Sequence, residues 1–173
     1  MGAEEQPIIN RVAKSPLITI DLEDYYVSGE RIEFDIKDLL FQGMILREKD
    51  FREFVREHDW SQYQDKNVAI FCSADAIVPT WAYMLLAAKL EPFANHLVFG
   101  NLQDLGKSLC LKAVEKTNFN EYENAKVVIK GCSKIEVPEF AFVELTRRLR
   151  PVVNSIMYGE PCSTVPIYKK PKN

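Results

Sequence analysis

Residues 60–92 read WSQYQDKNVAIFCSADAIVPTWAYMLLAAKLEP, and residues 119–151 read FNEYENAKVVIKGCSKIEVPEFAFVELTRRLRP. The two stretches align at an offset of 59 residues, which matches Tyr63 with Tyr122. Each contains a short apolar run, a loop that ends in proline, and a helical apolar pattern that stops at a second proline. The chain therefore contains two copies of one structural unit. The same offset aligns Val68/Val127, Ile70/Ile129, Val78/Val137, Pro79/Pro138, Ala82/Ala141, Leu86/Leu145, Leu90/Leu149, Pro92/Pro151, Asn95/Asn154 and Gly100/Gly159.

The apolar runs at residues 68–72 and 127–131 are short and rich in β-branched side chains, which is typical of buried strands. Pro79 and Pro138 suit the first turn of a helix, because the N–H group that proline lacks has no partner there. Each helix is expected to end just before the next proline, since proline removes a backbone hydrogen bond from a helix interior.

The order of elements is the same in both copies. A pattern typical of an amphipathic helix precedes each first strand, and strand-like runs at residues 96–100 and 155–159 close the copies. The unit is thus helix–strand–helix–strand, repeated at about residues 48–101 and 107–160. Alternation of this kind predicts a single α/β domain over residues 1–173 with a largely parallel sheet.

Two segments nearer the N-terminus also alternate between apolar and polar side chains. Residues 17–21 and 32–36 are therefore expected to be strands, placed at an edge of the sheet. Ser28 and Gly29 between them are typical of a turn.

Composition and charge exclude several classes of protein. The net charge is −3, which argues against a general nucleic-acid-binding protein, because such proteins neutralise phosphates with a basic surface. Charged residues interrupt the apolar stretches before they reach membrane-spanning length. The N-terminal residues lack an apolar signal core, so a cytoplasmic location is expected. Four cysteines in a cytoplasmic chain favour thiols or metal ligands over disulfides.

Three cysteines follow predicted strands. Cys72 ends one strand, Cys132 lies just past its counterpart, and Cys162 follows the run at residues 155–159. Because the carboxyl ends of parallel strands meet at one edge of a sheet, these thiols are expected to lie together there. Three thiolates suit zinc, iron or an iron–sulfur cluster. Asp75, Glu160 or a solvent molecule would supply the fourth ligand.

Two other roles for these cysteines stay open. A helix begins after Cys72 and after Cys132, and its positive end favours a reactive thiolate. Alternatively, buried cysteine behaves as a small apolar residue, which is the role expected for Cys110 on a helix face. The two histidines, His58 and His96, fall toward the amino ends of strands, which argues against a cysteine–histidine hydrolase.

Polar residues elsewhere have simple structural interpretations. The serine that follows each of the three cysteines is expected to cap the next turn. Arg147, Arg148 and Arg150 lie at a predicted helix C-terminus, where they complement the helix dipole. A binding site for an acidic partner or a phosphate is the alternative for these arginines.

Three stretches resemble one known family. They are NRVAKSPLITIDLEDYY, FCSADAIVPTWAYMLL and SIMYGEPCSTVP. They are similar to the bacterial family catalogued as domain of unknown function 2480, and the similarity extends from Ile9 to about Lys169. The genes of this family are associated with those for iron–sulfur cluster assembly by the sulfur-mobilisation system. The resemblance therefore implies an accessory role in cluster or sulfur handling, with iron–sulfur assembly proteins as partners.

Three hypotheses for the function follow from the sequence. The first is a thiolate site of Cys72, Cys132 and Cys162, with Asp75, that binds a metal ion or an iron–sulfur cluster. The second is a sulfur acceptor or transferase in which Cys72 or Cys162 carries a persulfide. The third is a metal-free protein-interaction module that forms a homodimer through the exposed edge of its sheet. Whether the protein is an enzyme stays open.

Overall fold

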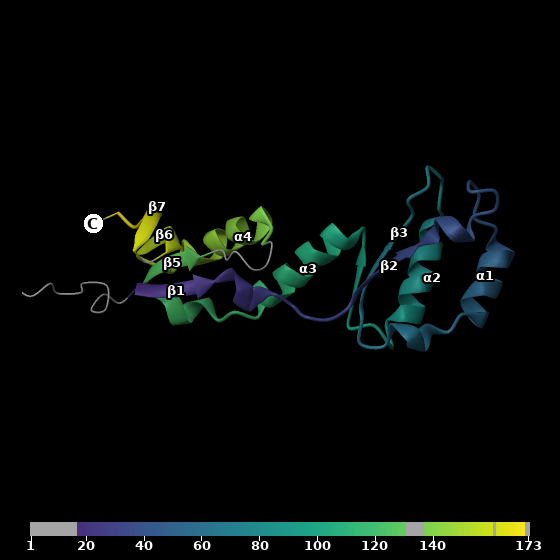
Figure 1. Cartoon of the computed structure of the whole chain (residues 1–173), viewed down its shortest axis with the longest axis horizontal. Coiled ribbons are helices and arrows are strands. Elements are labelled where there is room, and N and C mark those ends of the chain that lie inside the picture. The colour runs from purple at the N-terminus through teal and green to yellow at the C-terminus, as the bar shows by residue number, and fades with distance from the viewer. Residues whose placement is uncertain (1–16, 131–136, 161, 172–173) are drawn as a thin grey trace, which may run out of the picture. The chain divides into compact units, whose positions relative to one another are not determined.

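The computed structural model describes residues 17–130, 137–160 and 162–171. It confirms the α/β class, since helices and mostly parallel strands alternate along the chain (Figure 1). Among these residues no helix is long and apolar enough to cross a membrane. The strands form two sheets, where the sequence predicted one, and the chain divides into two compact units. We call Val27–Lys112 the continuous unit, and the residues up to Tyr26 and from Ala113 the discontinuous unit.

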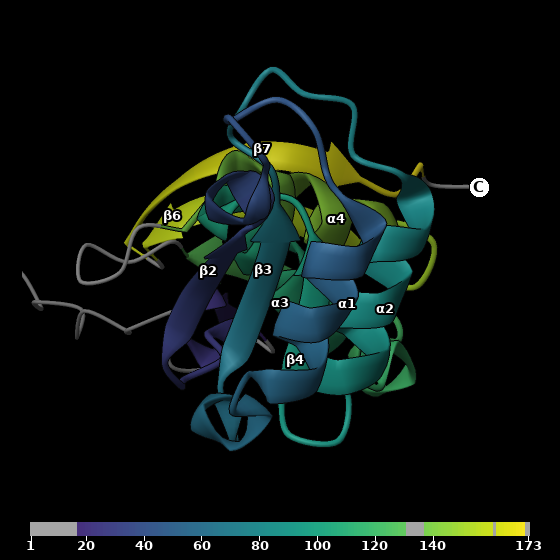
Figure 2. The same ribbon diagram turned by 90° about the vertical axis from the view of Figure 1, so that its right-hand side faces the viewer.

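The continuous unit contains a three-stranded parallel sheet. Its strands are β2 (Arg31–Asp35), β3 (Asn67–Phe71) and β4 (His96–Phe99), in that order across the sheet. The helices α1 (Glu48–Glu57) and α2 (Thr80–Leu90) lie on the same side of this sheet (Figure 2).

Both faces of the central strand β3 are buried, because its side chains alternate between two layers. Val68 and Ile70 belong to the core that α1 and α2 share. Ala69 points to the opposite face, where Leu105 and Leu109 of α3 (Leu102–Glu115) cover it. A strand covered on both faces needs apolar residues at every position, which explains the continuous apolar run in the sequence.

The discontinuous unit contains a four-stranded sheet in the order β1-β5-β6-β7. The strands β1 (Leu17–Asp21), β5 (Lys126–Lys130) and β6 (Ser155–Glu160) are parallel, and β7 (Ser163–Lys169) is antiparallel to β6. The helix α4 (Glu139–Leu149) buries Ala141, Leu145 and Leu149 completely. The chain leaves this unit after Tyr26 and returns to it within α3, between Lys112 and Ala113.

The strand registers of the two units are equivalent. In each unit an N-terminal edge strand pairs with the first strand of one copy, so the repeat includes a strand that the 59-residue alignment does not reveal. β1 and β2 are short strands that lie close together in the sequence, yet each joins a different sheet. The chain forms two sheets for this reason. The paired residues are Phe34 with Ile70 and Val68 with Leu97 in one unit, and Ile20 with Ile129 and Val127 with Ile156 in the other.

Local geometry repeats as well. The 3-10 helices η3 (Trp60–Tyr63) and η4 (Phe119–Tyr122) precede β3 and β5. Shortly after them, Asp65 and Asn124 have backbone φ angles of 60° and 58°. Aspartate and asparagine tolerate this left-handed conformation better than other non-glycine residues do. The duplicated order of elements is therefore confirmed, whereas the prediction of a single domain over residues 1–173 stays a prediction.

Candidate functional site

The carboxyl ends of β2 and β3 in the continuous unit bring several polar side chains together. Asp35, at the end of β2, accepts hydrogen bonds from the backbone N of Ser73 at 3.0 Å and from its Oγ at 2.6 Å. The same carboxylate accepts from the backbone N of Lys37 at 3.0 Å and lies 3.4 Å from its Nζ. Asp35 thus ties the ends of the two strands together. Ser73 donates to Asp35 and does not cap a turn, so its predicted capping role is wrong.

These contacts keep Asp35 ionised. Burial by itself raises the pKa of Asp35, but the hydrogen bonds from Ser73 and Lys37 outweigh it, and the pKa lies below its ordinary value. Hydrogen bonds to the charged form of a carboxyl group have this effect because they are lost on protonation. Asp35 is therefore a fixed negative charge at this end of the sheet.

Cys72 lies directly after β3, next to this carboxylate. Its side chain is half-buried against the core, and its Sγ donates to the carbonyl oxygen of Ala74 at 3.7 Å. Burial raises the pKa of Tyr83, and the nearby Cys72 and Asp35 raise it further. The thiol, the phenol and the carboxylate are therefore neighbours. The half-buried position of Cys72 against the core fits a packed cysteine.

The predicted cysteine site depended on a shared sheet edge. β3, which precedes Cys72, and β5, which precedes Cys132, lie in different sheets. The premise was therefore wrong for the strand before Cys72, whereas β5 and β6, the strands before Cys132 and Cys162, are parallel neighbours in one sheet. Cys132 lies outside the described residues, and Cys162 is exposed in the discontinuous unit.

Among the described residues, the surroundings of Asp75, the fourth residue of the predicted metal site, do not form a metal-binding group. Asp75 is exposed in the loop after β3. No group of three or more His, Cys, Asp or Glu side chains that could hold a metal ion occurs among residues 17–130, 137–160 and 162–171. The metal ion or iron–sulfur cluster stays a prediction. Cys110 is half-buried, and burial raises its pKa, which fits the apolar role expected for it.

Both histidines have structural environments. His58 Nε2 lies 3.2 Å from the hydroxyl of Tyr63, and burial lowers the pKa of the imidazole. His96, the first residue of β4, lies 2.8 Å from Ser108 Oγ through its Nε2. Burial, with Lys112 nearby, lowers its pKa too. These two histidines thus contact Tyr63 and Ser108, respectively.

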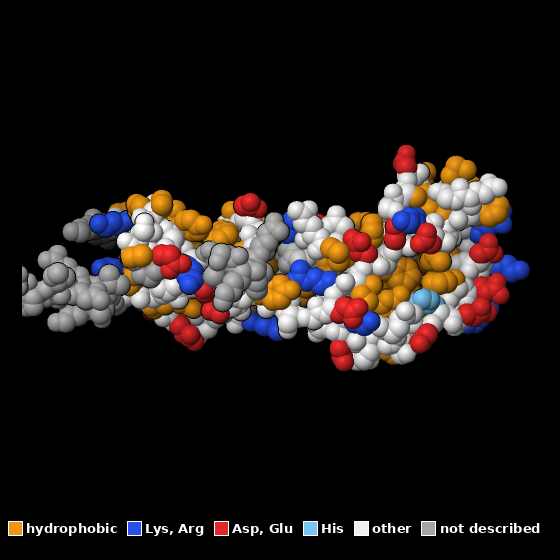
Figure 3. All heavy atoms as spheres, in the orientation of Figure 1, with side chains coloured by type: hydrophobic (Ala, Val, Ile, Leu, Met, Phe, Trp, Pro, Cys, Tyr) orange, Lys and Arg blue, Asp and Glu red, His pale blue; other side chains and the backbone are white. Residues whose placement is uncertain are grey.

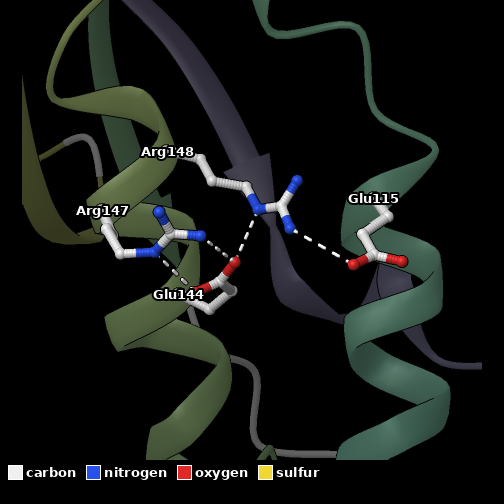
Figure 4. A network of polar contacts seen from close by, with 4 residues as sticks. All are labelled: Glu115, Glu144, Arg147 and Arg148. Atoms are coloured by element: carbon white, nitrogen blue, oxygen red, sulfur yellow. Dashed lines mark hydrogen bonds and ion pairs between the residues drawn. The ribbon is translucent and has the colours of Figure 1, made fainter.

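The arginine cluster at the end of α4 is neutralised within the discontinuous unit (Figure 4). Glu144 accepts hydrogen bonds from Arg147 at 2.7 Å and from Arg148 at 2.6 Å, and these bonds lower the pKa of Glu144 to about 2. Arg148 also lies 3.6 Å from Glu115 at the end of α3. Arg150 lies over the ring of Tyr168, with 5.2 Å to the ring centroid. These contacts support the structural interpretation over an anion site.

An exposed apolar surface that the sequence did not predict lies at this same end of the continuous unit. Phe41, Met44 and Ile45 are 38%, 59% and 60% exposed on a turn that precedes α1, and Ile77 is 91% exposed in the loop after β3. Ile45 forms backbone bridges with both Phe41 and Ile77, so the two loops are adjacent. Apolar atoms gather over these loops at the upper right of Figure 3. We call these four residues the apolar loop surface.

These features make the chain a duplicated α/β protein with mostly parallel strands. The sequence model of one family, described as "Protein of unknown function (DUF2480)", matches residues 6–170. The chain belongs to this family, and the resemblance noted in the sequence is confirmed. Comparison with curated proteins and with solved structures finds no significant match.

Proposed function

We propose that this protein is an interaction module whose apolar loop surface binds an apolar segment of a partner protein. The observation that carries the proposal is the exposure of four large apolar side chains on two adjacent loops. Contiguous apolar patches on protein surfaces commonly mark interaction sites. Complete burial of one such side chain contributes about 1.5–3 kcal/mol, so a partner that covers all four would gain several kcal/mol.

The turn that carries three of these residues is held in one conformation. The backbone N of Phe41 donates to the carbonyl oxygen of Ile45 at 2.8 Å, and the N of Ile45 donates back at 3.2 Å. The guanidinium of Arg47 lies 3.0 Å from the centroid of the Phe41 ring. A binding loop that is already ordered loses less conformational entropy when a partner docks. The rigidity of the turn therefore supports its use as a docking surface.

The fold itself does not require this surface. The sequence alignment places Glu136 of the second copy opposite Ile77 of the first. No apolar turn like residues 41–45 follows β1, because residues 27–31 are Val, Ser, Gly, Glu and Arg. The second copy therefore has polar or smaller residues at these aligned sequence positions, which supports a specific role over a general feature of the architecture.

The test uses the full chain as bait in a lysate of the cells that make it. Replacement of Ile45 or Ile77 by Asp would place a charge in the interface, which costs more than about 2 kcal/mol and lowers affinity about thirtyfold or more. Val143→Asp is the matched control, since Val143 is 68% exposed on α4 in the other unit. Quantitative mass spectrometry is expected to find a partner that wild type and Val143→Asp retain and both isoleucine variants lose.

Two results would contradict the proposal. One is the same set of bound proteins for Ile77→Asp and wild type. The other is self-association, measured by sedimentation, that Ile45→Asp abolishes, because the occupant would then be a second copy of the chain.

We further infer that the partner is cytoplasmic, where cysteine thiols stay reduced.

A further inference from the structure

A pocket of about 380 Å³ opens in the discontinuous unit. One wall comes from β1 and the 3-10 helix η1 (Leu22–Tyr25), and the other from residues 113–122 at the end of α3 and in η4. Its volume falls within the range of small-molecule binding sites. All of its lining residues belong to the discontinuous unit.

The other copy of the repeat fills the equivalent space with aromatic rings. There, the ring of Phe34 lies about 6 Å from four other rings, with centroid distances of 6.2, 6.1, 6.0 and 6.1 Å. The cluster is densely packed, as protein cores normally are. These four neighbours are Phe54, His58, Trp60 and Tyr63.

Smaller residues stand at most of these positions in the discontinuous unit. The strand register places Ile20 where the other unit has Phe34, and the 59-residue offset places Ala113, Thr117 and Phe119 where it has Phe54, His58 and Trp60. Only the tyrosine is retained, as Tyr122. The pocket therefore exists because one copy of a duplicated core has lost its large side chains while the backbone is retained.

The lining combines aromatic rings with carboxylates. Tyr25 and Tyr122 line the pocket together. Asp24 and Glu121 also line it. Burial raises the pKa of Tyr122, and Tyr25, Glu121 and Asp24 raise it further, so the potential around this hydroxyl is negative. Aromatic faces and carboxylates together attract organic cations.

We propose that this pocket binds a small organic molecule that carries an ammonium group. The ammonium group lies against the rings of Tyr25 and Tyr122, with Asp24 and Glu121 as its counter-ions. Lys116 is the cationic residue of the lining, and it is exposed. The proposal is independent of the apolar loop surface, which belongs to the continuous unit.

The test measures binding of tetramethylammonium chloride to the full-length protein by two-dimensional amide NMR. Potassium chloride at equal concentration controls for ionic strength, and tetramethylammonium acetate controls for the anion. Saturable shifts are expected at residues 19–25 and 113–122 with either tetramethylammonium salt, and not with potassium chloride. Absence of saturable shifts, or equal shifts with potassium chloride, would overturn the proposal.

Two pairs of substitutions locate the site. Ala113→Phe with Thr117→His restores the residues that the other copy uses to fill this space, so the variant is expected to fold and to lose binding. Asp24→Asn with Glu121→Gln keeps the volume and removes the charges, and it is expected to weaken binding at least tenfold. Binding that survives in the filled variant would place the site elsewhere. Binding that the neutral variant retains in full would contradict recognition of a cation.

Discussion

Asp35 shows how a single residue joins two strands at the end of a sheet. It accepts hydrogen bonds from Ser73 and Lys37, and its side chain is only 15% exposed. Its counterpart in the other copy is Asp21, which lies 3.4 Å from Lys130 Nζ. A carboxylate therefore stands at the end of the first strand in both units, although the charges that surround it differ.

Replacement of Asp35 by Asn is expected to lower the free energy of unfolding at neutral pH by about 2 kcal/mol, since hydrogen bonds to charged groups are lost. The folded-state pKa lies below the ordinary value of 3.8, so the contribution is present above pH 3.8 and disappears as pH falls through the folded-state pKa. Urea unfolding at neutral and acid pH measures it. Asp38→Asn, at an exposed position nearby, is the control, and an equal loss in both variants would contradict this role.

The thiolate hypothesis makes its own prediction at Cys72 and Cys162. That hypothesis predicts that protein purified without oxygen contains zinc, or iron with acid-labile sulfide, and that Cys72→Ser and Cys162→Ser each release it. Metal analysis, sulfide analysis and the visible spectrum measure this outcome. Colourless, metal-free protein with freely titrating thiols would eliminate the metal site and leave the interaction module.

At the scale of elements, a polar network joins α4 to the end of α3 (Figure 4). Glu144 is 12% exposed and binds both Arg147 and Arg148, while Arg148 also reaches Glu115. One carboxylate thus holds two guanidinium groups, one of which forms the link between the helices. Charge-assisted hydrogen bonds of this kind are stronger than neutral ones.

Glu144→Gln is expected to reduce the free energy of unfolding by about 1 kcal/mol at neutral pH. The pKa of Glu144 falls from 4.5 to about 2 on folding, so this stabilisation is complete above pH 4.5 and is lost as pH falls toward 2. Urea unfolding across this pH range measures it. Glu123→Gln, at an exposed position, should show no such pH dependence, and a pH-independent effect of Glu144→Gln would count against the network.

At the scale of the whole molecule, duplication produced two sheets that share one plan and differ in their surfaces. The continuous unit has a filled aromatic core and the apolar loop surface, whereas the discontinuous unit has the open pocket. Our two proposals therefore assign a protein-binding surface to one copy and a small-molecule pocket to the other. Divergence of this kind is expected once each copy has its own sheet and core.

Unfolding by two probes tests the prediction of a single domain over residues 1–173. Trp60 and Trp81 both belong to the continuous unit, so tryptophan fluorescence reports on that unit alone. Far-ultraviolet circular dichroism reports on the helices and strands of both units. A single domain predicts coincident transitions in urea. Two separated transitions would show that the compact units are independent domains.

The duplication, the α/β alternation and the element boundaries near proline could all be predicted from the amino-acid sequence. These features depend on residues that are neighbours in the chain, such as the β-branched runs at residues 68–72 and 127–131. The sequence also identified His58, His96 and the arginine cluster as structural, because their places at strand and helix ends follow from the same local patterns.

The assignment of strands to sheets required the folded structure. β1 and β2 look alike in sequence, but β1 pairs with β5, more than a hundred residues away, and β2 pairs with β3. Cys72 and Cys132 were expected to lie together, but they follow β3 and β5, which belong to different sheets. The apolar loop surface and the pocket also depend on contacts between distant segments, as where Ile45 meets Ile77 or where Ala113 leaves space beside Ile20. Local sequence patterns do not specify which distant segments pair, so these contacts could not be predicted from them.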